Sequence, residues 1–158
     1  MLVHRVYLNI QYAPYTENEL GHELIKVIVQ SDNGSIEATF ELNDECDDYV
    51  ELKLIYKDTE QSYQSRAHTY FDALNEIRKR LETDKKYPIC FGTCENVYPS
   101  GMQLDMGVGR LAYKQTLGKQ AVLIDIVDIF NSDDSCIPTS IEAQKVFHEK
   151  WIQSIINT

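Results

Sequence analysis

The apolar and polar residues of this 158-residue chain follow the two-residue repeat of strands in some segments and the helical repeat in others. In the first part of the chain, β-branched and aromatic residues predict four strands: Arg5–Tyr12, Glu23–Gln30, Ile36–Leu42 and Tyr49–Tyr56. Ser31–Gly34 contains the Asn-Gly pair that is typical of a β-hairpin turn. We therefore expect an antiparallel meander that carries its carboxylates on outward positions and in a loop.

A helical repeat follows the meander. Apolar residues recur at helical spacing across Tyr63–Glu82, with no proline or glycine inside that segment, so one long helix is expected there. Further strands are predicted at Tyr87–Gly92, Met106–Leu117 and Ala121–Phe130. A second long helix is expected to begin near Thr139, because Thr139-Ser-Ile-Glu142 has the form of a capping box. Its inner stripe is predicted to consist of Val146, Phe147, Lys150, Trp151, Ile155 and Ile156.

These segments predict an α+β fold with an antiparallel sheet and two long helices, near residues 63–82 and 140–156. The elements come in the order strands, helix, strands, helix. The length suits one globular domain spanning residues 1–158, which is enough to bury a sizeable core.

The charge distribution adds a feature that the repeat does not show. Ten carboxylates between Ser31 and Glu60 are opposed only by Lys53 and Lys57, so this segment carries −8 of the formal net charge of −10. A negative field of this strength repels nucleic-acid phosphates and anionic lipids and attracts a basic partner. We therefore predict a basic protein partner and expect neither nucleic acid nor membrane as a ligand.

The predicted partner-binding residues lie on the third and fourth strands and on the segments that follow them. Tyr49 and Tyr56 flank the carboxylates and are candidate aromatic anchors, which protein interfaces favour. A solvated acidic surface is the other explanation, since runs of charge are usually exposed. The full predicted set is Glu37, Glu41, Asp44, Glu45, Asp47, Asp48, Tyr49, Glu51, Tyr56 and Asp58.

The sequence shows no metal-binding motif and no targeting signal. Cys90 and Cys94 form one C-x3-C pair, but no second close ligand pair follows. We therefore expect no metal, no cofactor and four free thiols: Cys46, Cys90, Cys94 and Cys136. No signal peptide precedes the first predicted strand and no apolar run is long enough to span a bilayer, so a cytoplasmic location is predicted.

Catalytic motifs are also missing. Gly107-x-Gly109 is not followed by the Lys-Ser/Thr of a phosphate loop and is better explained as a bulge or tight turn before the strand residues Leu111–Lys114. Ser100 lies outside any G-x-S-x-G elbow. Asp125 and Asp128 are three residues apart in a predicted strand and so point to opposite sides. One of them is expected to pair with Arg110 or Lys114, and His148 is expected to pack beside Trp151. No catalytic residue is predicted.

With its carboxylates concentrated on Asp44, Glu45, Asp47, Asp48 and Glu51, this acidic chain resembles the immunity proteins of bacterial contact-dependent inhibition and polymorphic toxin systems. The segment Ser100–Tyr113 also looks like one that recurs in uncharacterised bacterial proteins of this size. The order of elements is similar to the whirly-type arrangement that some immunity proteins adopt. The resemblance implies an inhibitor that covers the cleft of a basic nuclease toxin with carboxylates that mimic phosphate.

Two other functions remain open at the level of sequence. One is a small-ligand-binding protein or enzyme with a pocket near Gly101–Gly109. The other is a structural or assembly subunit whose acidity serves only solubility. A deep polar pocket would favour the former, and self-association without a ligand would favour the latter.

Overall fold

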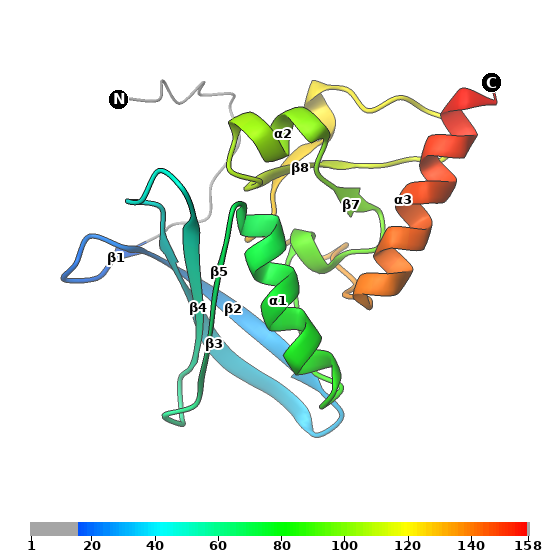
Figure 1. The fold of residues 1–158 in the computed structure, drawn as a ribbon. Coiled ribbons are helices and arrows are strands. Elements are labelled where there is room, and N and C mark those ends of the chain that lie inside the picture. The colour runs from blue at the N-terminus through cyan, green and yellow to red at the C-terminus, as the bar shows by residue number, and fades with distance from the viewer. Residues whose placement is uncertain (1–15, 158) are drawn as a thin grey trace.

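The computed structural model describes residues 16–157 (Figure 1). The predicted strand Arg5–Tyr12 lies outside these residues. An antiparallel meander runs in the order β1-β2-β3-β4-β5, and β6 pairs with the end of β2 that β1 leaves free. The bounds of its strands are Thr16–Glu17 (β1), Glu23–Ser31 (β2), Gly34–Asn43 (β3), Val50–Tyr56 (β4), Ser62–Ala67 (β5) and Tyr87–Pro88 (β6).

The β2–β3 hairpin forms where the sequence predicts it. Ser31 pairs with Gly34 across the turn, so Asp32 and Asn33 are the two turn residues and Gly34 begins β3. The Ser31 hydroxyl donates a hydrogen bond to the Gly34 carbonyl (2.9 Å) and accepts one from the Asn33 amide (3.3 Å). β2, β3 and β4 then alternate buried and more exposed side chains, which confirms the predicted half-buried strands.

The first long helix begins later than the sequence predicts. α1 spans Tyr70–Glu82, and Thr69 caps it by accepting a hydrogen bond from the Asp72 amide (3.1 Å). The start of the predicted Tyr63–Glu82 helix is wrong, because Ser62–Ala67 forms β5 and pairs with β4. Within α1 the predicted apolar stripe is confirmed, with its members buried against the sheet: Tyr70, Phe71, Leu74, Ile77 and Leu81.

The second half contains shorter elements than predicted. The three predicted strands reduce to two-, four- and three-residue strands. Single 3-10 turns at Phe91–Thr93 and Leu123–Asp125 interrupt the first and last predicted segments, and a tight turn at Val108 and Gly109 delays the start of the middle one. Gly101–Met106 forms a short helix, α2, which the sequence did not predict and which is capped by Ser100 and Gln103. The remaining elements are η1 (Phe91–Thr93), β7 (Val97–Tyr98), β8 (Leu111–Lys114), η2 (Leu123–Asp125), β9 (Ile126–Asp128) and α3 (Ile141–Ile156).

β7, β8 and β9 form a second antiparallel sheet, and α3 packs against β7 and α1 (Figure 1). The predicted stripe of α3 is partly wrong, since Val146, Lys150 and Ile156 are exposed. The covered face carries Trp151, as predicted, together with Gln144 and His148, each about one helical turn from the next. His148 stacks on Tyr98 (3.8 Å between ring centroids) and also on Trp151, which confirms its predicted packing role.

A single hydrophobic cluster joins the inner face of the large sheet, α1 and the second half of the chain. Phe130, just after β9, packs between Phe40 of β3 and Tyr70 of α1, with ring centroids 5.1 and 5.7 Å away. Arg110, just before β8, pairs with Glu23 at the start of β2, so β8 and its neighbour β9 lie beside the edge of the large sheet that carries β1.

Arg78 is a buried cation that fixes α3 to α1, with only 1% of the residue exposed. Its guanidinium donates hydrogen bonds to the Gln144 side chain (2.6 Å) and to the Thr139 carbonyl (2.8 Å). The Gln144 amide in turn donates to the carbonyls of Gly92 and Val97. Removal from water lowers the pKa of Arg78. These bonds link α1 and α3 to each other and to the backbone of η1 and β7.

Candidate functional site: the acidic loop and its support

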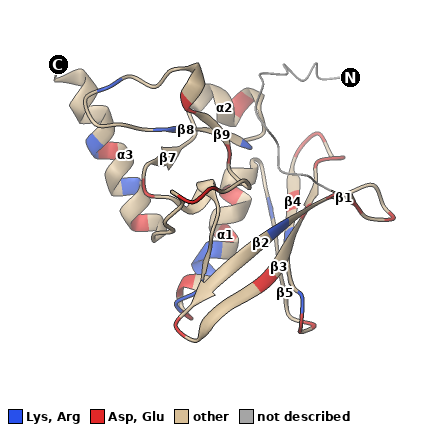
Figure 2. Cartoon of the chain, turned by 180° about the vertical axis from the view of Figure 1, so that it is seen from behind, with Lys and Arg blue, Asp and Glu red and all other residues tan. Residues whose placement is uncertain are grey.

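The acidic segment does not form one continuous face. Figure 2 shows its carboxylates on the sheet and in turns at both of its ends. Asp32 lies in the β2–β3 turn, and Asp58 and Glu60 lie in the β4–β5 turn at the same end. The β3–β4 loop lies at the other end. Because β4 has seven residues, the two ends are about 20 Å apart.

Two of the predicted carboxylates on the outer face of the sheet are neutralised by neighbouring cations. Glu37 accepts a hydrogen bond from the Lys57 ammonium (2.7 Å), which lowers the pKa of the Glu37 carboxyl. Glu51 accepts one from Arg66 of β5 (2.6 Å). These charges are already compensated within the protein, so they add little to its external field.

The β3–β4 loop keeps its charge. We define the acidic loop by its four exposed carboxylates, Asp44, Glu45, Asp47 and Asp48. Within residues 16–157, no cation forms an ion pair with the side chain of Asp44, Asp47 or Asp48. Four negative charges therefore project together from one end of the sheet.

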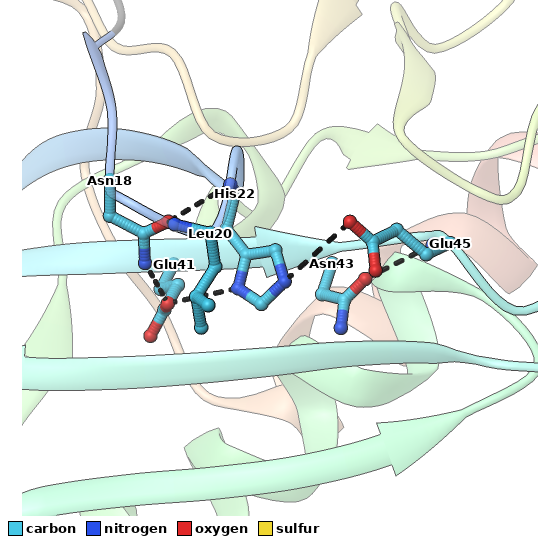
Figure 3. Close-up of polar contacts among 6 residues, drawn as sticks. All are labelled: Asn18, Leu20, His22, Glu41, Asn43 and Glu45. Carbon is cyan, nitrogen blue, oxygen red and sulfur yellow. Dashed lines mark hydrogen bonds and ion pairs between the residues drawn. The ribbon is translucent and has the colours of Figure 1, made fainter.

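The acidic loop is supported at its base by a polar cluster from the β1–β2 turn and β3 (Figure 3). His22 Nδ1 contacts Glu41 Oε1 (3.0 Å), and its Nε2 lies 3.9 Å from Glu45 Oε1. Asn18 also donates to Glu41, and its Oδ1 accepts hydrogen bonds from the backbone amides of Leu20 and His22. The predicted residue Glu41 is thus an internal support of the loop, with its side chain only 16% exposed.

A second set of bonds anchors the loop to β3. The Asn43 side chain accepts a hydrogen bond from the Glu45 backbone amide (3.0 Å). Farther along the loop, the Asp48 carbonyl contacts His68 Nδ1 (3.0 Å). Both ends of the acidic loop are therefore held by side chains, which reduces the conformational entropy that it would lose on binding.

A small hollow of about 100 Å³ lies beside the acidic loop, lined by residues that include Glu17, His22, Asp44 and Arg110. Arg110 binds Glu23 Oε2 (2.5 Å) and Asp128 Oδ2 (2.9 Å). The one guanidinium on this wall is thus matched by two carboxylates, and the surroundings of the loop stay negative.

The Arg110–Asp128 pair confirms the prediction that one of the two aspartates after β8 has a buried cationic partner. Asp128 is fully buried, which raises the pKa of its carboxyl, and Arg110 opposes that rise. Asp125 has a different role, because it accepts a hydrogen bond from the Val122 backbone amide (2.9 Å). The two carboxylates do not converge on one site.

The two predicted aromatic anchors lie in different environments. Tyr49 is half-buried at the end of the acidic loop, with the Arg66 guanidinium 4.1 Å from its ring centroid. Tyr56 is only 3% exposed and belongs to the core, and burial raises the pKa of its hydroxyl. Tyr56 therefore offers no surface to a partner in this structure, and Tyr49 offers part of one.

A larger groove of about 460 Å³ is lined by residues of β5, α1 and α3. Its walls include Arg66, Lys79, Glu76 and Tyr98. Lys79 is paired with Glu76 (2.7 Å) and Arg66 with Glu51, so two of its three cations are already engaged, and the third is Lys145. The groove has a size that suits a small ligand, but few free polar groups converge on it.

The segment Gly101–Gly109 contributes to neither of these hollows. The predicted tight turn before β8 is confirmed, since Val108 and Gly109 both have positive φ angles, 50° and 66°. The Val108 carbonyl accepts a hydrogen bond from the Tyr70 amide (2.7 Å), so this turn packs on the start of α1. The segment is used for packing in the described structure.

Asn18, His22 and Arg110 are site residues that the sequence reading missed. Only Asn18 had a recognisable signal. In a polar turn, an Asn side chain often accepts hydrogen bonds from backbone amides a few residues later, as in an Asx turn. His22 and Arg110 reach the loop only through strand pairing and the packing of β9, and no local pattern encodes either contact.

Among residues 16–157, no group of three or more His, Cys, Asp or Glu side chains is arranged to hold a metal ion. No helix in the same range has the length and apolar character needed to cross a membrane. No protein-family model matches the chain, and a comparison with curated proteins finds no relative. The geometry of the acidic loop therefore carries the functional argument.

Proposed function

We propose that this protein binds a basic protein partner through the acidic loop, and that it acts as an immunity protein against a nuclease toxin. One observation carries the proposal. Among the residues that the structure describes, the exposed carboxylates of Asp44, Asp47 and Asp48 have no cationic partner, whereas Glu37 and Glu51 on the same sheet are neutralised by Lys57 and Arg66. The surface that keeps its charge is the surface available for binding.

The loop suits a groove that normally binds phosphates. Its carboxylates can accept hydrogen bonds from the Arg and Lys side chains that line such a groove, and charge-assisted bonds of this kind are among the strongest in interfaces. The contacts of His22 and Asn43 with Glu45 hold the start of the loop in place before binding. Tyr49, next to the carboxylates, would supply apolar contact at the rim.

The class of partner comes from the resemblance to toxin-system immunity proteins. The proposal assigns binding and inhibition to this chain, without a reaction, a metal or a cofactor of its own. The cytoplasm is the compartment in which such an inhibitor would meet its toxin, so that location is part of the same proposal.

The proposal predicts that a gene for a basic nuclease domain lies beside this protein's gene, and the test uses that domain. We expect one equivalent of the protein to abolish nuclease activity. We also expect the association rate constant to fall about tenfold or more between 50 and 500 mM NaCl, because salt screens the steering field. Full nuclease activity in the presence of excess protein would overturn the immunity role.

A small-ligand-binding function is a second candidate, and the volume of the α1–α3 groove favours it. It ranks below the first, because the groove's Arg66 and Lys79 are already paired with carboxylates. A screen of small zwitterionic and anionic metabolites by thermal shift would support it if one compound stabilises the wild type and fails to stabilise a Lys79→Ala variant.

A further inference from the structure

Two of the four cysteines lie side by side although 42 positions separate them in the sequence. The sulfur atoms of Cys94 and Cys136 are 2.7 Å apart, and no disulfide joins them. This distance is far shorter than the sum of two sulfur van der Waals radii, so the thiols are already in the position from which a disulfide forms. The sequence reading considered only Cys90 and Cys94 as a pair.

The backbone around these thiols is held in register by hydrogen bonds. Cys94 forms an antiparallel bridge with Pro138, and the Thr139 amide donates to the Thr93 carbonyl (2.8 Å). The Cys136 amide donates to the Asp133 carbonyl (3.0 Å). The segment between β9 and α3 therefore lies along η1 before any bond forms, and closing the pair requires no large movement of the chain.

We infer that Cys94 and Cys136 are a disulfide-forming pair, and that the bond fastens the segment before α3 to η1 under oxidising conditions. This inference is independent of the proposed function. Its oxidant is a peroxide. One thiol attacks the O–O bond and becomes a sulfenic acid, with release of water. The second thiol then attacks that sulfur, the S–S bond forms and a second water leaves.

The surroundings of the pair favour the first step. The hydrogen bond from Cys136 and the backbone amide of Ile137 lower the pKa of Cys94, and Lys114 adds a smaller effect of the same sign. Cys136 is half-buried, so the pair is not sealed from solvent. Cys90 differs, because complete burial raises the pKa of its thiol to about 12.

The bond would act on the helix that follows. The Cys94 carbonyl accepts a hydrogen bond from Gln144 of α3 (3.0 Å), and the side chain of Ser140 caps that helix four residues after Cys136. A covalent link here closes a loop of 42 positions and removes conformations from the unfolded chain. Oxidation would therefore stabilise the packing of α3 on α1.

The experiment compares reduced protein with protein treated with hydrogen peroxide at a low molar excess. We expect the intact mass to fall by two hydrogens, peptide mapping to show Cys94 linked to Cys136, and dithiothreitol to reverse the change. The midpoint of thermal unfolding is expected to rise by roughly 5–10 °C on oxidation.

The Cys136→Ser variant should lose both the mass change and the thermal shift, whereas the Cys46→Ser variant, altered in the acidic loop's own segment, should keep both. If Cys136→Ser fails to fold, the wild-type mass and mapping data still decide the matter. Oxygen adducts without a disulfide, a bond that involves Cys46, or an intermolecular dimer would each overturn the assignment. A Cys94–Cys136 bond that leaves the unfolding midpoint unchanged would overturn its stapling role.

Discussion

At the scale of single residues, Gly109 shows how a turn and a helix start depend on one missing side chain. Its φ of 66° is a conformation that other residues rarely adopt, and a Cβ atom there would lie 2.7 Å from Thr69 Cβ. Thr69 caps α1, and the Val108 carbonyl in the same turn as Gly109 accepts a hydrogen bond from the Tyr70 amide. Backbone strain and steric overlap would therefore act together at this position.

We predict that Gly109→Ala lowers the free energy of unfolding by about 2–4 kcal/mol. Gly101→Ala is the matched control, because a Cβ at Gly101 meets nothing within 4 Å and the residue is the first of α2. The control should be neutral to within about 0.5 kcal/mol. Urea denaturation of both variants measures the difference, and equal stabilities would contradict the account of this turn.

At the scale of elements, the sequence predicts well where side chains alternate and poorly where two periods overlap. β2, β3 and β4 were predicted within one or two residues, since each alternates over its full length. β5 was missed because Ala67 fits both the alternation of that strand and the helical stripe of α1. Only the pairing of Ser62–Ala67 with β4, a long-range contact, decides between the two.

The same limit applied to α3 and to the candidate site. The covered face of α3 carries Gln144 because buried Arg78 needs an acceptor, and no apolar pattern encodes that need. The acidic loop itself was evident from its composition, whereas the neutralisation of Glu37 and Glu51 and the burial of Tyr56 depend on strand register. The candidate binding surface therefore contains fewer residues than the sequence predicted.

For α3 we predict that Gln144→Leu lowers the free energy of unfolding by about 3 kcal/mol or more, because it leaves the Arg78 guanidinium and several carbonyls with fewer partners. Lys145→Ala, at the exposed neighbouring position, is the control and should change stability by less than about 0.5 kcal/mol. Hydrogen exchange should show faster opening of α3 in the Gln144 variant. Protection of α3 at the wild-type level would count against its anchoring by Arg78.

At the scale of the whole molecule, stability should fall at alkaline pH. Burial raises the pKa of Tyr70 above its usual value of 10.0, and it raises that of Cys90 from 9.0 to about 12. Both groups stay protonated in the folded state while the unfolded chain releases their protons. Their contribution is therefore complete below about pH 9 and declines as the pH rises, by up to about 1.4 kcal/mol per pH unit for each group.

Urea denaturation at pH 8.0 and 10.5 tests this expectation. The wild type should lose stability over that interval, and Tyr70→Phe, which removes one of the two groups, should lose measurably less. Parallel stability curves for the two proteins would show that Tyr70 does not titrate between the folded and unfolded states as its burial implies.

Acidic residues lie at both ends of the large sheet, and our proposal assigns binding to only one of these ends. The acidic loop lies at one end of the sheet, its base is supported by His22 and Asn43, and Asp44, Asp47 and Asp48 have no ion pair within residues 16–157. The turns that contain Asp32, Asp58 and Glu60 lie at the other end. If net charge alone attracted the partner, both ends would contribute equally. If the acidic loop is the interface, only one of them would.

The most direct measurement is a calorimetric titration of the basic nuclease domain with two charge-matched triple variants. One variant carries Asp44→Asn, Asp47→Asn and Asp48→Asn, and the other carries Asp32→Asn, Asp58→Asn and Glu60→Gln, so the net charge changes equally. We predict that the first weakens binding by about 2–5 kcal/mol and that the second weakens it by less than about 1 kcal/mol. Equal affinities for the two variants would contradict the assignment of the acidic loop as the binding surface.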